Sequence, residues 1–294
     1  TITVGTSSMQ TNATLAIATG AINITGNIVG GGNSTSADNA AGGRFNVQGN
    51  ATVNGNIGSI SGILADIRIQ DGATLTILGA SRNIYANNIT MMDIGLIGTN
   101  NATLMFNGTG TTTVNGIIAG ETTEGEGLID INTGIVSFKN TVGSASSYIS
   151  GIDIADGSTM TTSSNIYANS TIKVRGTLNI DSTGGITIAV NDQYGDGGGL
   201  QIGGNTLGDN GTLETAGTIT LTSNKITARD SSTNATFNNA TIRLNGTHSS
   251  HASIANAYID IGTNNQTLIM QGNTTIDLDL QNTVITDGPT IVII

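Results

Sequence analysis

Apolar residues alternate with polar ones in short segments along most of the chain. Leu75 and Ile77 alternate with threonines in the segment 72–79, and Leu178 and Ile180 repeat the pattern. Gly, Asn or Asp precedes or follows each segment. Alternation with a period of two, bounded by turn residues, is typical of β-strands that are buried on one face only. We therefore expect strands with an aliphatic inner face and an outer face made mostly of threonine.

These strand-like segments recur along the chain at a spacing near 20 residues or its multiples. Their Gly- or Asn-led starts lie at positions 72, 101, 134, 157, 176, 217 and 240. The pentapeptide Asn-Ile-Tyr-Ala-Asn occurs twice, at 83–87 and 165–169. A period near 20 with several strands in each period predicts an all-β, right-handed parallel β-helix in which each period forms one coil. We expect a single β-helix domain over residues 1–294, with roughly 12 to 14 coils.

Four Gly-rich or polar stretches interrupt the alternation and predict short loops that leave the coils. Each stretch is too short to form a domain of its own. Loops on a rigid scaffold are common sites of recognition. The four stretches are 30–43, 120–127, 191–205 and 228–235.

The composition supports stacked strands. Gly, Thr, Ile and Asn make up more than half of the chain, whereas charged residues are 10% of it and Pro occurs once, at position 289. Strands paired on both sides need every backbone N–H, which Pro lacks. Like charges repel when they stack at the ~4.8 Å spacing of neighbouring strands. The absence of Cys excludes a disulfide scaffold, a thiolate metal site and a cysteine nucleophile.

The charge distribution argues against nucleic acid and membranes as partners. The net charge is −11, and nine cations are scattered among 20 carboxylates. Such a surface repels phosphate groups and anionic lipid. We find neither a signal-peptide leader nor an apolar run approaching the ~18 residues of a membrane helix. Because the first residue is Thr, we expect a processed protein or a piece of a longer one.

Candidate catalytic residues are few, and we predict that the chain is not an enzyme. His248 and His251 lie in a polar segment, and no Gly-x-Ser-x-Gly motif accompanies them. Polysaccharide-active β-helix enzymes instead place carboxylates on neighbouring strands, and this activity stays open as an alternative. Its candidate residues are Asp153, Asp156, Asp192, Asp196, Asp260, Asp277 and Asp279.

Two acidic segments are weak candidates for cation binding. Asp192 and Asp196 lie in a Gly-rich segment whose oxygens could hold Ca²⁺, although the segment matches neither the EF-hand nor a Gly-Gly-x-Gly-x-Asp repeat. Glu121, Glu124 and Glu126 form an acidic patch for which a solvated loop is the simpler interpretation. We therefore predict neither a metal nor any other cofactor.

The texture of the sequence resembles a known family. Gly176-Thr-Leu-Asn-Ile180, Gly72-Ala-Thr-Leu-Thr-Ile77 and Ile24-Thr-Gly-Asn-Ile28 are similar to segments of the passenger regions of bacterial type V autotransporters, in particular surface antigens of the rickettsial outer-membrane-protein-B kind. The resemblance implies an exported β-helix that is displayed as an adhesin or as surface-layer protein. The family's translocator barrel and protease serine motif have no counterpart here, which implies a passenger fragment or a processed passenger.

These observations predict a non-catalytic, structural or adhesive β-helix on the outer surface of a bacterium. Its partner is expected to be a receptor on a host or neighbouring cell, or further copies of itself. In the second case the chain is a filament or surface-layer subunit that associates head to tail, because an uncapped β-helix end is an exposed sheet edge. The candidate contact residues are those of the two strand-like termini: Ile2, Val4, Ile291 and Ile293.

Overall fold

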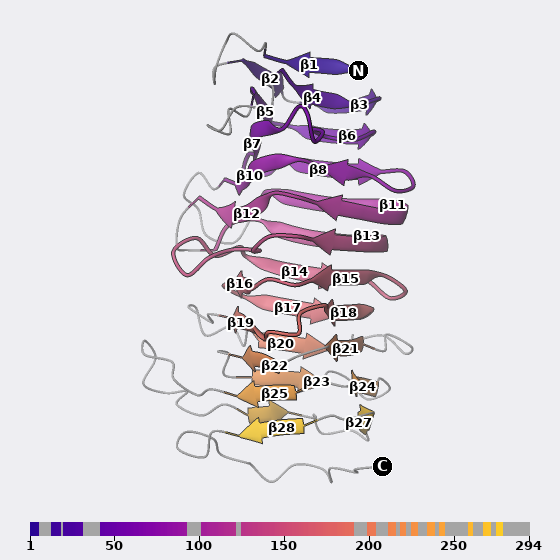
Figure 1. The fold of residues 1–294 in the computed structure, drawn as a ribbon, viewed down its shortest axis with the longest axis vertical. Coiled ribbons are helices and arrows are strands. Elements are labelled where there is room, and N and C mark those ends of the chain that lie inside the picture. Colours follow the sequence, from indigo (N-terminus) through magenta and orange to yellow (C-terminus); the bar gives the residue numbers. More distant parts are fainter. Residues whose placement is uncertain are drawn as a thin grey trace. The chain divides into compact units, whose positions relative to one another are not determined.

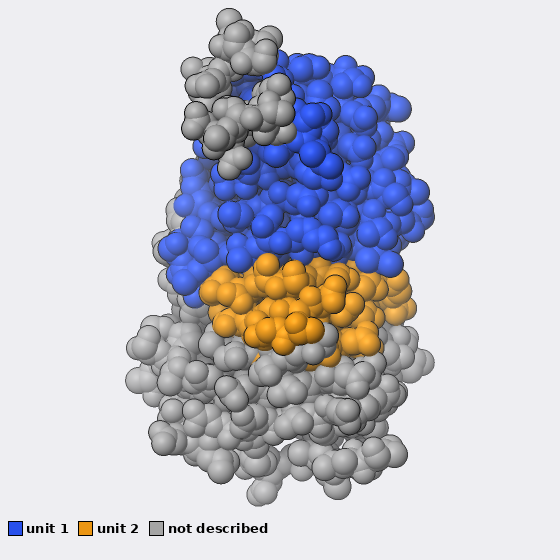
Figure 2. Space-filling view, in the orientation of Figure 1, with its two compact units in different colours: residues 1–150 blue, residues 151–294 orange. Residues whose placement is uncertain are grey.

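A computed structural model describes two compact units, residues 1–150 (unit 1) and 151–294 (unit 2). Figure 2 colours them blue and orange. With side chains, it describes residues 1–5, 13–18, 20–31, 42–92, 101–121, 125–190, 199–203 and 211–215. From residue 218 onward it describes the strands up to residue 278, and of their side chains only Ile219. All regular elements of the described residues are β-strands, and among these residues no helix could span a membrane.

Unit 1 contains thirteen strands. Their bounds are β1 Ile2–Val4, β2 Thr14–Ile17, β3 Ala21–Thr25, β4 Ile28–Gly30, β5 Arg44–Val47, β6 Asn50–Asn54, β7 Leu64–Ile69, β8 Thr74–Leu78, β9 Asn83–Ile84, β10 Ala86–Met91, β11 Thr103–Val114, β12 Ile117–Gly120 and β13 Leu128–Phe138.

The strands of unit 1 stack in parallel columns, one coil upon the next (Figure 1). One column runs β2-β5-β7-β10-β12, and a second runs β3-β6-β8-β11-β13. The third begins with β1 and β4 and continues through Ile57, β9 and the second half of β11. Because consecutive strands along the chain belong to different columns, each coil has three sides.

Unit 2 repeats this three-sided arrangement with greater regularity. Its columns are β14-β17-β20-β23-β26, β15-β18-β21-β24-β27 and β16-β19-β22-β25-β28, all parallel. The bounds are β14 Gly151–Ile154, β15 Thr159–Thr162, β16 Ile166–Ala168, β17 Thr171–Val174, β18 Thr177–Ile180, β19 Ile186–Val190, β20 Gly199–Ile202, β21 Gly211–Thr215, β22 Thr218–Leu221, β23 Lys225–Ala228, β24 Asn234–Asn238, β25 Thr241–Leu244, β26 Tyr258–Asp260, β27 Thr267–Gln271 and β28 Thr275–Leu278. The prediction of a parallel β-helix is confirmed.

The alternating apolar residues fill the interior of the coils. In unit 1, Ala51, Leu75, Leu104 and Ile129 are buried on successive strands of one column. Ile172 and Leu200 form a similar buried stack in unit 2. Each stack removes aliphatic surface from water, at about 25 cal/mol for each Å². The inner and outer faces predicted from the period-two pattern are therefore confirmed.

The predicted coil length is wrong. Leu75 lies opposite Leu104, 29 residues later. In unit 2, Leu178 follows Met160 by 18 residues, whereas Leu213 follows Leu178 by 35. Most coils are longer than 20 residues, so the expected 12 to 14 coils is too many. The four predicted loop segments explain part of the variation, since each falls between two strands; their central residues lie outside the described part of the chain.

Glycines occupy one corner of five successive coils in unit 1. They are Gly26, Gly55, Gly79, Gly108 and Gly134, which the strand register places in line. A Cβ at position 55 would collide with the carbonyl of Gly26, one at position 108 with the carbonyl of Gly79, and one at position 134 with the carbonyl of Gly108. The backbones therefore approach at this corner more closely than any side chain allows.

Candidate functional site

The N-terminal end of unit 1 presents unpaired strand edges. In the described part of the chain, β1 pairs only with β4, β2 only with β5 and β3 only with β6. Three strands of the first coil therefore keep one side of their backbone without a sheet partner. Such an edge is a template for pairing with another chain.

Apolar side chains accompany this open edge. Ile2 is 39% exposed and Ile22 is 40% exposed, although their register partners Ile28 and Ala51 are buried. Val4, the other contact residue predicted for this terminus, is only 4% exposed, so mainly the backbone of β1 remains available there. The two candidates at the opposite terminus, Ile291 and Ile293, lie outside the described residues.

The candidate carboxylates separate into paired, exposed and undescribed groups. Asp153 accepts hydrogen bonds from Arg175 Nε at 3.1 Å and from its terminal nitrogen at 2.9 Å, and it lies opposite Lys173 in the strand register. Asp156 is exposed, and the backbone of Asp260 and Asp277 lies in β26 and β28. Asp192, Asp196, Asp279, His248 and His251 lie outside the described residues.

No metal-binding group emerges from the acidic residues that the structure describes. Among them, no three His, Cys, Asp or Glu side chains come together. Glu121 is exposed, as expected, but Glu126 is 2% exposed, and its carboxylate lies against Gly120. The interpretation of Glu126 as part of a solvated patch is therefore wrong. Glu124 lies outside the described residues.

Polar side chains form ladders on the outer surface of unit 1. Arg68 forms an ion pair with Asp66 on β7, and Thr90 on β10 donates to the same carboxylate at 3.0 Å. Gln70 Nε2 donates to Asn46 Oδ1 on β5 at 3.3 Å. The outer face of this column is thus cross-linked by hydrogen bonds between coils as well as by its backbone ladder.

Asparagines form a second ladder at a turn. Asn27 Oδ1 accepts a hydrogen bond from the backbone N–H of Asn56 at 2.9 Å, and Asn56 Oδ1 accepts one from the N–H of Asn83 at 2.9 Å. Asn165 repeats the contact in unit 2, where it accepts from Thr187 N–H at 2.8 Å. The sequence analysis expected Asn at turns, and the structure shows that these side chains link one coil to the next.

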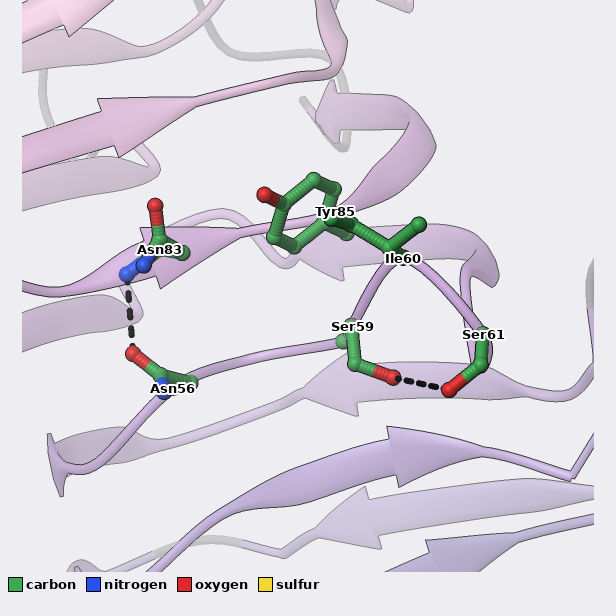
Figure 3. Close-up of a pocket in the computed structure, with 7 residues that line it drawn as sticks. Asn56, Ser59, Ile60, Ser61, Asn83 and Tyr85 are labelled. Carbon is green, nitrogen blue, oxygen red and sulfur yellow. Dashed lines mark hydrogen bonds between the residues drawn. The ribbon is translucent and has the colours of Figure 1, made fainter.

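A hollow of about 350 Å³ opens beside this ladder (Figure 3). The turn after Asn56 forms one wall, and Asn83 and Tyr85 of the following coil form the other. In Figure 3 the Tyr85 side chain lies between Asn83 and Ile60. Gly58 is required at the base of the turn, because its φ is +74° and a Cβ would collide with the carbonyl of Tyr85.

The sequence analysis missed this hollow, although a signal for its turn was present. Gly58-Ser59-Ile60-Ser61 is matched by Gly143-Ser144-Ala145-Ser146. Both segments form a tight turn closed by an antiparallel bridge, from Ser59 to Gly62 and from Ser144 to Ser147. In both, φ of the glycine is +74°. The Gly-Ser-x-Ser pattern therefore identifies a turn type, but the hollow also needs Tyr85 from the next coil.

Comparisons with known proteins yield no relative. No protein-family model matches the chain, and neither a curated protein nor a solved structure is significantly similar to it.

Proposed function

We propose that this chain is a surface-displayed β-helix of a bacterium, with a structural or adhesive role and no catalytic activity. One observation carries the proposal: aliphatic stacks fill the interior of the coils in both units. Partners can therefore meet only the outer faces, the turns and the open strand edges. The buried core also gives those outer positions a rigid support.

The family resemblance supports the same role. Passenger regions of autotransporters are β-helices, and the parallel β-helix found here is compatible with one. The lack of Cys agrees with export through the periplasm in an unfolded state, because a disulfide would obstruct threading. Display on the bacterial surface, and a receptor on a host or neighbouring cell, follow from this resemblance as parts of the proposal.

The adhesive role is tested by adding fluorescently labelled protein to a panel of bacterial and cultured mammalian cells. We expect saturable binding to at least one cell type, with displacement by excess unlabelled protein. A labelled acidic protein of similar size serves as the control. Linear, non-displaceable binding to every cell type contradicts an adhesive role. Release of oligosaccharides from a polysaccharide substrate, lost in Asp153→Asn, overturns the non-catalytic assignment.

The open end favours a second candidate function, which is head-to-tail assembly. The unpaired edges of β1, β2 and β3, together with Ile2 and Ile22, offer both backbone hydrogen bonds and apolar surface to another copy. The end of one copy would meet a different surface of the next, and such a contact continues without closure.

The second candidate predicts that the mass in solution depends on protein concentration. We expect the mass measured by sedimentation to rise with concentration, and the double variant Ile2→Lys, Ile22→Lys to remain monomeric because charge blocks the edge. Ile117→Lys is the matched control, since Ile117 is 44% exposed on β12, away from the first coil. A wild-type chain that stays monomeric throughout, or an equal effect of Ile117→Lys, contradicts assembly through this end.

A further inference from the structure

We propose that the hollow beside Tyr85 binds an uncharged saccharide unit. The inference deepens the adhesive role proposed above, and rests on it, by assigning a ligand class to one outer site of unit 1. It follows from the shape of the hollow, from the apolar and polar groups that line it, and from the lack of charge among those groups.

The size of the hollow fits a small ligand. Its volume of about 350 Å³ lies near the lower end of the 300–1,000 Å³ typical of ligand pockets. The two walls come from successive coils, and the backbones of these coils are joined by the hydrogen bond from Tyr85 N–H to the Ile57 carbonyl at 2.7 Å. The walls are therefore held at a fixed separation before any ligand arrives, which limits the entropy lost on binding.

The apolar part of the lining suits the C–H face of a sugar ring. Ile60 is 71% exposed, although an isoleucine on a tight turn contributes nothing to the core there. The partly exposed Tyr85 side chain lies close to it in Figure 3. Tyr offers an apolar ring face and a polar hydroxyl, so it can stack on a sugar ring and hydrogen-bond at the same time.

The polar part of the lining suits the hydroxyl groups of a sugar. Asn56 is held in place because its Oδ1 accepts from Asn83 N–H, and this bond leaves its Nδ2 directed to other acceptors. The hydroxyls of Ser59 and Ser61 lie 3.5 Å apart, a distance at which their mutual hydrogen bond is weak. Amide and hydroxyl groups both donate and accept, as sugar hydroxyls do.

The lining carries no charge, which selects against ionic ligands. All seven lining residues are neutral. The nearest cation along the chain, Arg82, donates instead to Asn54 Oδ1 at 2.6 Å and to the Leu78 carbonyl at 3.2 Å. An acidic sugar or a phosphate would lose hydration without gaining a counter-charge. A site this small binds a single sugar with an affinity on the order of mM, so tight cell binding requires several contacts at once.

The second copy of the pentapeptide supplies a matched control. Tyr167 follows Asn165-Ile166 as Tyr85 follows Asn83-Ile84, but its hydroxyl accepts a hydrogen bond from Asn165 Nδ2 at 3.4 Å. Tyr167 is not among the residues that line the hollow. Removing the Tyr167 ring therefore reproduces the chemical change at Tyr85 without altering the proposed site.

The test is saturation-transfer NMR on the complete chain with methyl β-galactoside, N-acetylglucosamine and N-acetyllactosamine, and with N-acetylneuraminate as the charged comparison. We expect transfer to at least one neutral sugar at mM concentration and none to N-acetylneuraminate. Tyr85→Ala should weaken binding roughly tenfold, whereas Tyr85→Phe and Tyr167→Ala should stay within about twofold. Circular dichroism and the urea midpoint of each variant show whether it is folded.

Three results overturn the inference: no transfer to any neutral sugar, equal binding by folded Tyr85→Ala, or preferred transfer to N-acetylneuraminate. These results differ from a failure of the proposed function. If the labelled protein still binds cells saturably while no neutral sugar binds, the adhesive role stands and the saccharide site is wrong. If a neutral sugar binds but no cell does, the site stands and the adhesive role fails.

Discussion

Gly55→Ala should unfold unit 1 or lower its stability by at least about 3 kcal/mol, beyond the usual cost of overpacking a core. Gly55 follows β6 and is stacked on Gly26 of the preceding coil, whose N–H donates to the Asn54 carbonyl at 3.2 Å. The added Cβ would collide with the Gly26 carbonyl. Because this neighbour is backbone, rotation of a side chain cannot relieve the collision. The urea midpoint measured by circular dichroism checks the result.

Gly184→Ala is the matched control for this substitution. A Cβ at Gly184 would meet nothing within 4 Å, so the same chemical change adds no contact. We expect it to leave the midpoint unchanged or to stabilise the chain by up to about 1 kcal/mol, because Ala restricts the unfolded chain more than Gly does. Similar losses for the two variants would show that the coils do not approach each other at the Gly55 corner.

Phe106→Ala should cost about 3–5 kcal/mol, the usual range for removing a buried aromatic side chain. Phe106 and Phe138 are both 1% exposed, and their rings meet edge to face with centroids 5.9 Å apart. The substitution therefore leaves a cavity and also removes a favourable aromatic contact. The free energy of unfolding from urea titrations provides the measurement.

The neighbouring residue separates burial from a general effect of shortening side chains. Met105 precedes Phe106 on β11 but belongs to the outer face, opposite Thr76. Met105→Ala should cost less than about 1 kcal/mol, because its side chain is only partly buried. If both variants lose the same stability, the inward and outward assignment of β11 is wrong.

The fold class could be predicted from the sequence because it depends on local chemistry. Alternation at Leu75 and Ile77 requires one buried face, and that face is the observed core. The coil length could not be predicted in the same way. Residues 72 and 101 start strands of one column, but position 134 lies within β13 at the glycine corner. All three sides of a coil use similar Gly- and Thr-rich segments, so spacing alone cannot tell one side from another.

The candidate sites depend on contacts between coils, and these contacts explain what the sequence could not predict. Val4 alternates like an edge residue but is buried, because β1 pairs with β4 on the following coil. Glu126 belongs to an acidic run, yet its carboxylate is packed against Gly120. Tyr85 and Ile60 are 25 residues apart, and only the stacking of coils brings both to one hollow. The repeated Asn-Ile-Tyr-Ala-Asn pentapeptide gave no hint of that partner.

The register of the coils underlies every surface described above, and thiol cross-linking tests it most directly. The chain contains no Cys, so Thr76→Cys and Met105→Cys introduce a single pair on outward positions that the structure places opposite each other. We expect dibromobimane, a short reagent that fluoresces when it joins two thiols, to bridge this pair within one molecule. The pair Thr76→Cys, Thr103→Cys is one alternation out of register and should bridge poorly. Equal bridging of both pairs, or none of the first, would contradict the stacked coils on which the proposed function depends.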